Sequence, residues 1–325
     1  MTIDIVCATD DNYAHHCGIM LTSLFENNRS CKFNVHILTA TLNVENVDRY
    51  KQLAVTYGHS IDIILVEESL FDQCVIRESD HVSIATYYRF IVSSILPEDV
   101  KTILYLDCDM VITGDITDLI TDPMYDLSSD IAIAAVSGAS EKYGECYNRL
   151  EYDQSKGYFN AGVLVINVQY WRDNDVSNRL FEYVQNHQDV KFHDQDTLNY
   201  VLRDNKLLLP IKYNMQHLYL YNDYCAEFDM YTEVFDNLKD IRIVHYTSND
   251  KPWMKMCKHP FANEYIKYKE ISLWSDEPLL KPCRQVSLYT KTMRQFRSEI
   301  KKILVKIGLI SPFVEKGYIK VDDVL

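Results

Sequence analysis

Short apolar segments alternate with helical segments in this chain of 325 residues, and this alternation restricts its fold more than any other feature. Apolar runs at Ile3–Ala8, Phe33–Thr39 and Ile61–Val66 are typical of buried strands, and helical segments at Ala14–Phe25 and Val44–Tyr57 separate them. Strands that alternate with helices form parallel sheets whose faces the helices cover. The sequence therefore predicts an α/β fold.

The pattern continues as far as residue 245. The further predicted elements are a helix at Ser83–Leu96 that Pro97 stops, strands at Thr102–Leu106, Ile131–Val136, Gly162–Val168 and Ile241–His245, and helices at Val176–His187 and Thr197–Arg203. The chain is long enough for one large domain with a sizeable core. Its character changes near Pro278, so we expect a folded domain over residues 1–278 and a basic amphipathic tail over residues 279–325.

The charge is divided unevenly between these two parts. Residues 281–325 contain 10 Lys and Arg against 4 Asp and Glu, a net charge of +6. Because the formal net charge of the whole chain is −14, residues 1–280 carry −20. Such an acidic body argues against nucleic-acid binding, which needs a basic face. Within the tail, Lys291–Lys306 has apolar residues at a spacing close to 3.6, which predicts an amphipathic basic helix. Such helices attach to anionic membranes, pack on a neighbouring domain or bind a partner.

The cysteines and the N-terminus bear on the expected location. Nine cysteines occur at irregular spacings and no CxxC pair is present, which predicts reduced thiols rather than a disulfide scaffold. No secretion signal is apparent at the N-terminus, and no stretch reaches the roughly 18 apolar residues typical of a membrane span. We expect a cytoplasmic protein, attached to the inner face of the membrane if the tail binds lipid.

Asp107 and Asp109 directly follow the predicted strand Thr102–Leu106. In open parallel sheets, ligands bind beyond the carboxyl ends of the strands, and two carboxylates there suit a hard divalent ion that also holds a diphosphate. His245 ends the last predicted strand, and an added imidazole favours Mn²⁺ over a site of oxygen ligands alone. A second Asp-x-Asp sequence, residues 173–175, is expected to cap a helix instead.

Other polar positions allow two interpretations each. Asp10 and Asn12 follow the first strand and suit either a nucleotide contact or a cap for the next helix. Asn160 precedes a small residue and a glycine, which suits a sugar contact with close backbone approach or a simple turn. Asp194 suits a ligand contact or a helix cap, and Lys251 a diphosphate contact or the protein surface. The chain lacks GxSxG, HExxH and GxxxxGK[ST], so these motifs give no support to serine hydrolase, zincin or P-loop activity.

Six segments, in the same order, resemble glycosyltransferase family 8, especially its bacterial lipopolysaccharide galactosyl- and glucosyltransferases. They are IVCATDDNY at residues 5–13, HVSIATYYR at 81–89, ILYLDCD at 103–109, YFNAGVLVIN at 158–167, DQD at 194–196 and VHYTSNDKPW at 244–253. The resemblance implies a GT-A fold with a Rossmann-like mixed sheet, and transfer of galactose or glucose from a UDP-sugar to a lipopolysaccharide, capsule or other surface glycan. It also implies retention of configuration and Mn²⁺ as cofactor, with Mg²⁺ as a substitute.

The resemblance further assigns roles to single residues. It implies Asp107, Asp109 and His245 as metal ligands; Ala8, Asp10 and Asn12 as uridine contacts; Arg89, Cys108 and Lys251 as further contacts of the UDP-sugar; Asn160 and Ala161 as donor-sugar contacts; and Asp194 and Gln195 as the catalytic pair near the reacting carbon. Asp194 would serve as nucleophile if a covalent intermediate forms. The route that we favour brings the acceptor in on the leaving-group face, with Gln195 placing the sugar.

One departure and three alternatives accompany this prediction. Where the lipopolysaccharide enzymes often have Gly after the metal-binding His, this chain has Ser248-Asn249-Asp250, an unexpected acid. A metal-dependent nucleotidyltransferase or phosphohydrolase could use Asp107 and Asp109. The 24 tyrosines also fit a self-glucosylating protein like glycogenin. The third alternative is a non-catalytic protein that binds sugar nucleotides.

Overall fold

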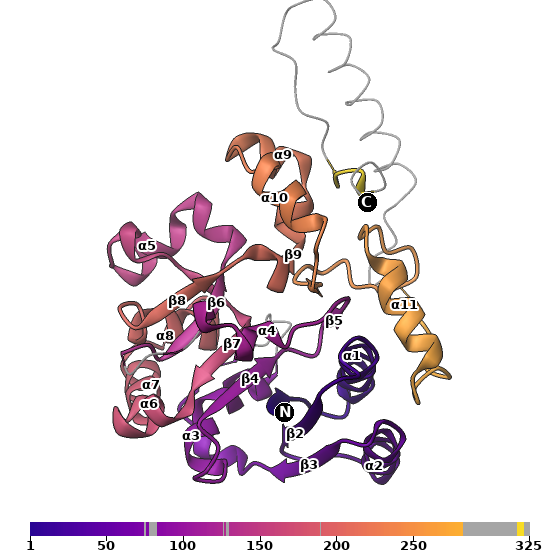
Figure 1. The fold of residues 1–325 in the computed structure, drawn as a ribbon. Coiled ribbons are helices and arrows are strands. Elements are labelled where there is room, and N and C mark those ends of the chain that lie inside the picture. Colours follow the sequence, from indigo (N-terminus) through magenta and orange to yellow (C-terminus); the bar gives the residue numbers. More distant parts are fainter. Residues whose placement is uncertain are drawn as a thin grey trace, which may run out of the picture.

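The computed structural model describes residues 1–74, 76–77, 83–125, 127, 130–188, 190–281 and 317–321. Two sheets lie at its centre, with helices on both sides of the larger one (Figure 1). The larger sheet has the strand order β3-β2-β1-β4-β7-β6-β8 and the smaller one β5-β10-β9. The strands are β1 (Thr2–Ala8), β2 (Lys32–Thr39), β3 (Ser60–Leu65), β4 (Thr102–Leu106), β5 (Met110–Ile112), β6 (Ile133–Ser137), β7 (Phe159–Asn167), β8 (Lys206–Leu209), β9 (Met215–Gln216) and β10 (Ile243–His245).

Alternating residues of each central strand supply two apolar cores. Ile5 of β1 packs into one core and Val6 into the other, because successive side chains of a strand point to opposite faces. Helices α1 (Ala14–Asn27), α2 (Val44–Tyr57) and α11 (Ala262–Ile271) contribute to the first core; α3 (Val92–Ile95), α6 (Val168–Asp173), α7 (Val176–Asn186) and α8 (His193–Val201) contribute to the second. The remaining helices are α4 (Asp118–Thr121), α5 (Glu145–Leu150), α9 (Asn222–Glu227) and α10 (Tyr231–Leu238).

The large sheet is mixed, as the family resemblance implies, and not wholly parallel. Strands β1 to β4 pair in parallel, and β7 runs antiparallel between β4 and β6. Strand β7 begins at Phe159, so Asn160 and Ala161 lie within a strand and the simple-turn alternative for them is wrong. Helix α8 begins at His193, four residues before the predicted start at Thr197, and its first turn therefore contains Asp194 and Gln195.

The predicted α-helix at Ser83–Leu96 is wrong in type over most of its length. Residues Ile84–Ile91 form a 3₁₀ helix, and only Val92–Ile95 continue as the α-helix α3. Such tight helices are uncommon beyond three or four residues. Here Arg89 and its flanking residues Tyr88 and Phe90 are all buried, so tertiary contacts rather than amphipathic periodicity determine the backbone.

The chain crosses from one sheet to the other at the turn after β4. Strand β5 pairs antiparallel with β10, and in this register His245 is the partner of Met110. The last residue of β10 therefore lies next to the turn that contains Asp107 and Asp109. This crossing brings together residues that are far apart in the sequence.

The described part of the predicted tail packs against the domain. Leu280 donates its backbone N–H to the Trp253 carbonyl (2.8 Å) and accepts from Lys255 (2.8 Å). Residues 317–321 return to the domain, where Ile319 donates to Leu220 (2.8 Å) and is buried. The predicted helix Lys291–Lys306 lies outside the described residues.

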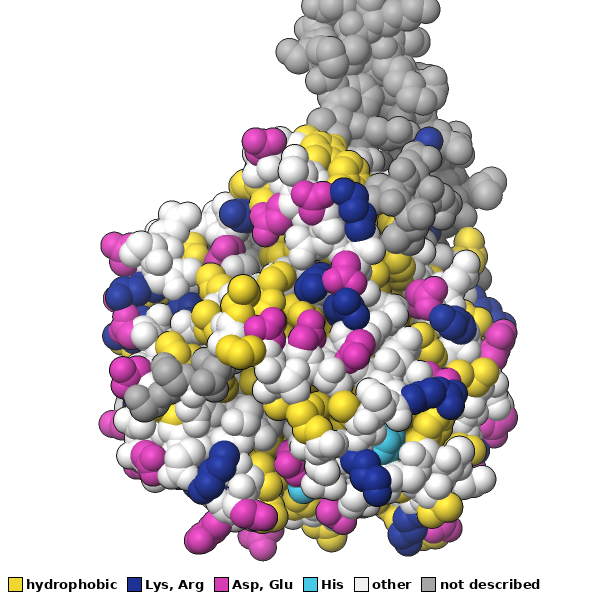
Figure 2. All heavy atoms as spheres, viewed as in Figure 1, with side chains coloured by type: hydrophobic (Ala, Val, Ile, Leu, Met, Phe, Trp, Pro, Cys, Tyr) yellow, Lys and Arg dark blue, Asp and Glu magenta, His cyan; other side chains and the backbone are white. Residues whose placement is uncertain are grey.

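The surface carries charges of both signs. On the face shown in Figure 2, the basic side chains are interspersed with acidic and hydrophobic ones and form no continuous stripe. None of the helices in the described residues is long and apolar enough to cross a membrane.

Candidate active site

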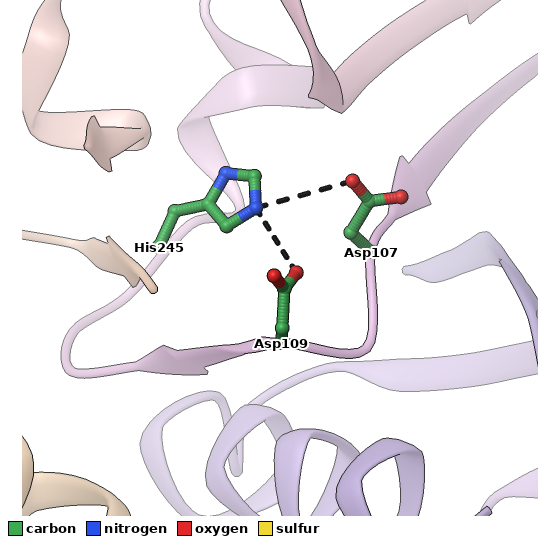
Figure 3. Close-up of side chains that lie close together, drawn as sticks. All are labelled: Asp107, Asp109 and His245. Carbon is green, nitrogen blue, oxygen red and sulfur yellow. Dashed lines mark hydrogen bonds and ion pairs between the residues drawn. The ribbon is translucent and has the colours of Figure 1, made fainter. Parts of the chain in front are cut away.

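Asp107, Asp109 and His245 converge on one point (Figure 3). Each offers one ligand atom, and the three atoms lie within 4.8 Å of one another. His245 Nε2 is 3.0 Å from Asp109 Oδ1 and 3.9 Å from Asp107 Oδ2. Both carboxylates follow β4 and the imidazole ends β10, so the carboxyl ends of two strands supply all three groups. Two carboxylates and one imidazole are a donor set that suits a divalent ion such as Mn²⁺.

Lys251 adds a positive charge to this group. Its Nζ donates to Asp109 Oδ2 (2.6 Å) and to the Tyr246 carbonyl (2.5 Å). Burial alone would raise the pKa of Asp109, but the charges of Lys251 and His245 outweigh it and hold the pKa well below its usual range. Asp109 is therefore ionised at neutral pH, as a metal ligand must be.

Asn214 holds His245 in one orientation, and none of the sequence motifs contains it. His245 Nδ1 lies 2.9 Å from Asn214 Oδ1, and Asn214 Nδ2 donates to Asn160 Oδ1 (2.8 Å). Asn160 Oδ1 also accepts from the backbone N–H of Gly162 (3.0 Å), so it is an oxygen and the neighbouring Asn214 atom is the amide nitrogen. Asn214 Oδ1 therefore accepts the Nδ1 proton, so Nε2 of His245 is the ring nitrogen that would bind a metal ion in place of a proton.

We expect Asn214→Ala to weaken metal binding about 10- to 100-fold, the range found when a hydrogen-bond partner of a metal ligand is removed. His245 would lose the acceptor that sets its tautomer. Titration of the protein with Mn²⁺, followed by electron paramagnetic resonance of the free ion, measures the effect. Asn214→Asp keeps an oxygen for Nδ1 and is expected to retain more affinity than Asn214→Ala; equal losses would contradict this role.

Arg89 contacts two carboxylates of the site and is only 3% exposed. Its Nη2 donates to Asp107 Oδ1 (2.8 Å), and its Nε is 3.1 Å from Asp194 Oδ2. Its Nη1 donates to the carbonyl of Ala161, and its guanidinium lies over the Tyr105 ring at 4.2 Å. Arg89 thus joins a metal-site carboxylate to the predicted catalytic residue Asp194.

Asp194 and Gln195 begin α8 beside β7. Asp194 accepts from Thr86 Oγ1 (2.6 Å) and pairs with Arg89, so its side chain holds the 3₁₀ helix instead of capping α8. Burial raises the pKa of Asp194, and the positive charge of Arg89 lowers it by less, so the pKa stays above its usual value. Gln195 Oε1 accepts from Asn160 Nδ2 (3.0 Å) and from the backbone N–H of Ala161 (3.1 Å). The structure therefore brings the predicted sugar-contact residues together.

The residues predicted to contact uridine lie around the turn after β1. Ala8 accepts a hydrogen bond from Cys108 Sγ (3.2 Å), which ties this strand end to the metal-site turn. Asp10 Oδ1 accepts from the backbone N–H of Tyr13 (3.0 Å), a bond that fits the alternative role of Asp10 at the start of α1. Asn12 is exposed. Tyr13, which the sequence analysis did not single out, lies edge-on to Trp253 (5.9 Å).

Two further positions show how the backbone is used. Gly162 lies so close to the site that an added Cβ would be 2.2 Å from His245 Cε1 and 2.9 Å from Asp107 Oδ2. We expected a close approach to the backbone at this glycine, and the groups that approach it are the side chains of His245 and Asp107. The unexpected Asp250 accepts from the backbone N–H of Lys258 (3.0 Å), so its carboxylate closes its own loop.

The Asp-x-Asp sequence at residues 173–175 takes no part in the site. Asp173 accepts from Gln169 Nε2 (2.8 Å) and Asp175 from Asn178 Nδ2 (2.7 Å). Asp175 occupies the position before α7, but its side chain makes no capping hydrogen bond, so the predicted cap is wrong.

Two imidazoles near the site, one buried and one partly buried, predict loss of stability in acid. Burial lowers the pKa of His217 to about 4 and that of His259 to about 3. Because the unfolded chain binds these protons near pH 6.5 and the folded chain does not, their stabilising contribution is present above pH 6.5 and is lost toward pH 4. The slope is at most about 1.4 kcal/mol per pH unit for each group. Urea unfolding of wild type and His259→Gln between pH 7 and 4.5 tests this, and an unchanged slope in the variant would contradict it.

Comparison with known proteins agrees with this fold. The model of glycosyl transferase family 8 matches residues 4–257. General stress protein A of Bacillus subtilis is 29% identical, with 83% of this chain and 94% of that protein covered. Lipopolysaccharide glucosyltransferase WaaO of Escherichia coli is 28% identical, with 87% and 82% covered. The structure of the galactosyltransferase LgtC in complex with donor and acceptor sugar analogues matches with a TM-score of 0.71 and 25% identity, over 83% of this chain and 96% of that one.

The mixed sheet with its flanking helices is thus a GT-A fold, as expected, and the protein is a glycosyltransferase. The chain belongs to glycosyltransferase family 8. This confirms the resemblance drawn from the six sequence segments.

Proposed function

We propose that the protein transfers galactose or glucose from a UDP-sugar to a lipopolysaccharide, capsule or other surface glycan, with Mn²⁺ as cofactor and with retention of configuration. The observation that carries this proposal is the convergence of Asp107, Asp109 and His245, with Lys251 bonded to Asp109. A divalent ion held by these three residues would supply Lewis-acid stabilisation of the leaving diphosphate. Lys251 is placed to add a fixed positive charge beside it.

The environment of Asp194 supports the route without a covalent intermediate. One of its oxygens accepts from Thr86, and the other pairs with Arg89. A carboxylate with both oxygens engaged and 5% exposed is poorly placed to attack a sugar. We therefore assign Asp194 to holding Arg89 and Gln195 to contacting the donor sugar, while the acceptor oxygen approaches on the leaving-group face.

The relatives support the class of donor and acceptor. Their names include glucosyltransferases and galactosyltransferases of lipopolysaccharide, so both hexoses stay candidates. Ala8, Asp10 and Asn12 are proposed to contact uridine, with Cys108 and Arg89 behind the diphosphate, and Asn160 and Ala161 beside the sugar.

Self-glucosylation is less well supported. Ten tyrosines are among the largest fully buried side chains of the described residues. The high tyrosine content therefore mainly builds the core, and buried hydroxyls cannot serve as acceptors without unfolding. A nucleotidyltransferase or phosphohydrolase would not account for the membership in family 8.

The test is release of UDP from UDP-galactose and UDP-glucose, with and without Mn²⁺. We expect release from one donor only when the metal is present, and faster release with a suitable glycan. Nuclear magnetic resonance of the product would then show whether the anomeric configuration is retained. Absence of UDP release from either donor, with every divalent metal and acceptor tried, would contradict the proposal.

We further propose that the basic tail attaches a cytoplasmic enzyme to the anionic inner face of the membrane. Because Leu280 and Ile319 bond to the domain on either side of the basic stretch, truncation at residue 281 would also remove packed residues. The sharper variant replaces Arg294, Arg297 and Lys301 by Gln and keeps residues 317–321. We expect it to lose binding to vesicles of anionic lipid, at about 1 kcal/mol for each removed charge, and unchanged binding would contradict the proposal.

A further inference from the structure

The amide of Gln195 is held on both of its sides. Its Oε1 accepts from the backbone N–H of Ala161 (3.1 Å) and from Asn160 Nδ2 (3.0 Å), and its Nε2 donates to the Tyr158 hydroxyl (2.9 Å). A backbone N–H is only a donor, so the amide atom that faces Ala161 is the oxygen. The orientation of this amide therefore follows from its contacts alone.

The Tyr158 hydroxyl links the amide of Gln195 to the carboxylate of Asp196. It accepts from Gln195 and donates its own proton to Asp196 Oδ1 (2.8 Å). A carboxylate only accepts hydrogen bonds, so the phenol cannot turn to donate toward Gln195 without giving up its hydrogen bond to Asp196. Tyr158 and Asp196 are both fully buried, where an unsatisfied polar group is costly.

The carboxylate of Asp196 accepts several hydrogen bonds besides the one from Tyr158. Besides Tyr158, it accepts from Arg149 Nε (3.0 Å) and Nη2 (2.7 Å) and from the backbone N–H groups of Lys191 (3.1 Å) and Phe192 (2.9 Å). Five donors thus fix one carboxylate. The bidentate guanidinium adds directional strength to this anchor.

We propose that Tyr158, Asp196 and Arg149 are positioning residues that fix the amide of Gln195 for sugar transfer. Gln195 Nε2 carries two hydrogens and Tyr158 takes one of them, so the other is available to a hydroxyl or ring oxygen of the donor sugar. The inference rests on the proposed function and deepens it: Gln195 presents a donor N–H, rather than its carbonyl oxygen, to the substrate. The same set of bonds continues through Asn160 and Asn214 to His245, so the sugar side and the metal side of the site share one network.

Tyr158→Phe tests the proposal, with Tyr152→Phe as its matched control. Tyr152 belongs to the same small aromatic cluster, and its hydroxyl donates to a backbone carbonyl, that of Gly157 (3.2 Å). We expect Tyr158→Phe to lower kcat about 10- to 100-fold, as misplacement of a catalytic group does, while the affinity for UDP and Mn²⁺ stays close to that of Tyr152→Phe. A kcat equal to that of the control would overturn the proposal.

A double-mutant cycle separates positioning from a general structural effect. If Tyr158 acts through Gln195, Tyr158→Phe should lower kcat in the wild type and change it less than 2-fold in a Gln195→Ala background. Multiplicative effects of the two substitutions would overturn the proposal.

A readout without activity distinguishes failure of this inference from failure of the proposed function. If the wild type released no UDP from any donor, the proposed function would fail, but the Gln195 side-chain amide could still be observed by nuclear magnetic resonance. We expect one of its two N–H protons to exchange slowly with water, and that protection to be lost in Tyr158→Phe. Equal exchange of both protons in the wild type would show that Tyr158 does not hold the amide.

Discussion

Gly162→Ala is expected to reduce metal-dependent turnover at least 100-fold. The added methyl carbon would lie 2.2 Å from His245 Cε1, 2.8 Å from His245 Nδ1 and 2.9 Å from Asp107 Oδ2. Neither side chain can give way cheaply, because Asn214 holds His245 and Arg89 holds Asp107. Displacement of reacting or binding groups by about 1 Å can cost a factor of 10² in rate. Titration with Mn²⁺ and the rate of UDP release both measure the effect.

Gly114→Ala is the matched control for this substitution. The three atoms nearest to its added methyl carbon all belong to Arg242, with Cδ at 2.9 Å, and Arg242 takes no part in the metal site. We expect near wild-type metal affinity and turnover in this control. Wild-type metal affinity in Gly162→Ala would show that the three ligand side chains are not held as the structure indicates.

Arg89→Met is expected to destabilise the fold by about 3–5 kcal/mol, the cost of breaking a buried ion pair by removing one partner. Asp194 would remain buried, and Asp107 would lose its only guanidinium contact among the described residues. Urea unfolding measures the loss. Arg49→Met is the control, because the carboxylates of its partners Glu45 and Asp276 are exposed, and such pairs contribute about 0–1 kcal/mol.

The deficit of Arg89→Met should also depend on pH in a defined direction. Burial raises the pKa of Asp194 already in the wild type, against the influence of Arg89. A raised pKa in the folded state means that stability falls as the pH rises through it. Without Arg89 the deficit should therefore grow with pH, and Asp194→Asn in the same chain should recover part of it. A deficit that is constant with pH and unaffected by Asp194→Asn would contradict the burial of an unpaired carboxylate.

The residues at strand ends were predictable, and the residues that support them were not. Asp107, Asp109 and His245 each follow an apolar run and match the metal-ligand positions that the family resemblance implies, so they could be named from the sequence. Their convergence depends on the pairing of β5 with β10, which the apolar pattern does not encode. Asn214 lies 31 positions before His245 and follows only a short apolar stretch, and no local pattern marks it as a partner. Tyr158 and Asp196 are likewise joined across 38 positions by a single hydrogen bond.

The errors in the predicted elements have a common cause. Local periodicity was misleading at residues 84–91, which form a 3₁₀ helix that carries the buried Arg89 and its two carboxylate partners. Strand β7 reads as one more apolar run, and its antiparallel direction depends on connections that the apolar pattern does not encode. Where a side chain serves the site, local propensity was the weaker guide.

Binding of UDP with and without Mn²⁺, measured by calorimetry on wild type and Asp109→Ala, tests the central claim most directly. The claim is that Asp107, Asp109 and His245 hold a divalent ion that in turn holds the diphosphate. Asp173→Ala, at the exposed Asp-x-Asp sequence of residues 173–175, is the control. The account predicts strong UDP binding that requires Mn²⁺ in wild type and Asp173→Ala and is lost in Asp109→Ala. Equal UDP binding without metal, or undiminished metal-dependent binding in Asp109→Ala, would contradict it.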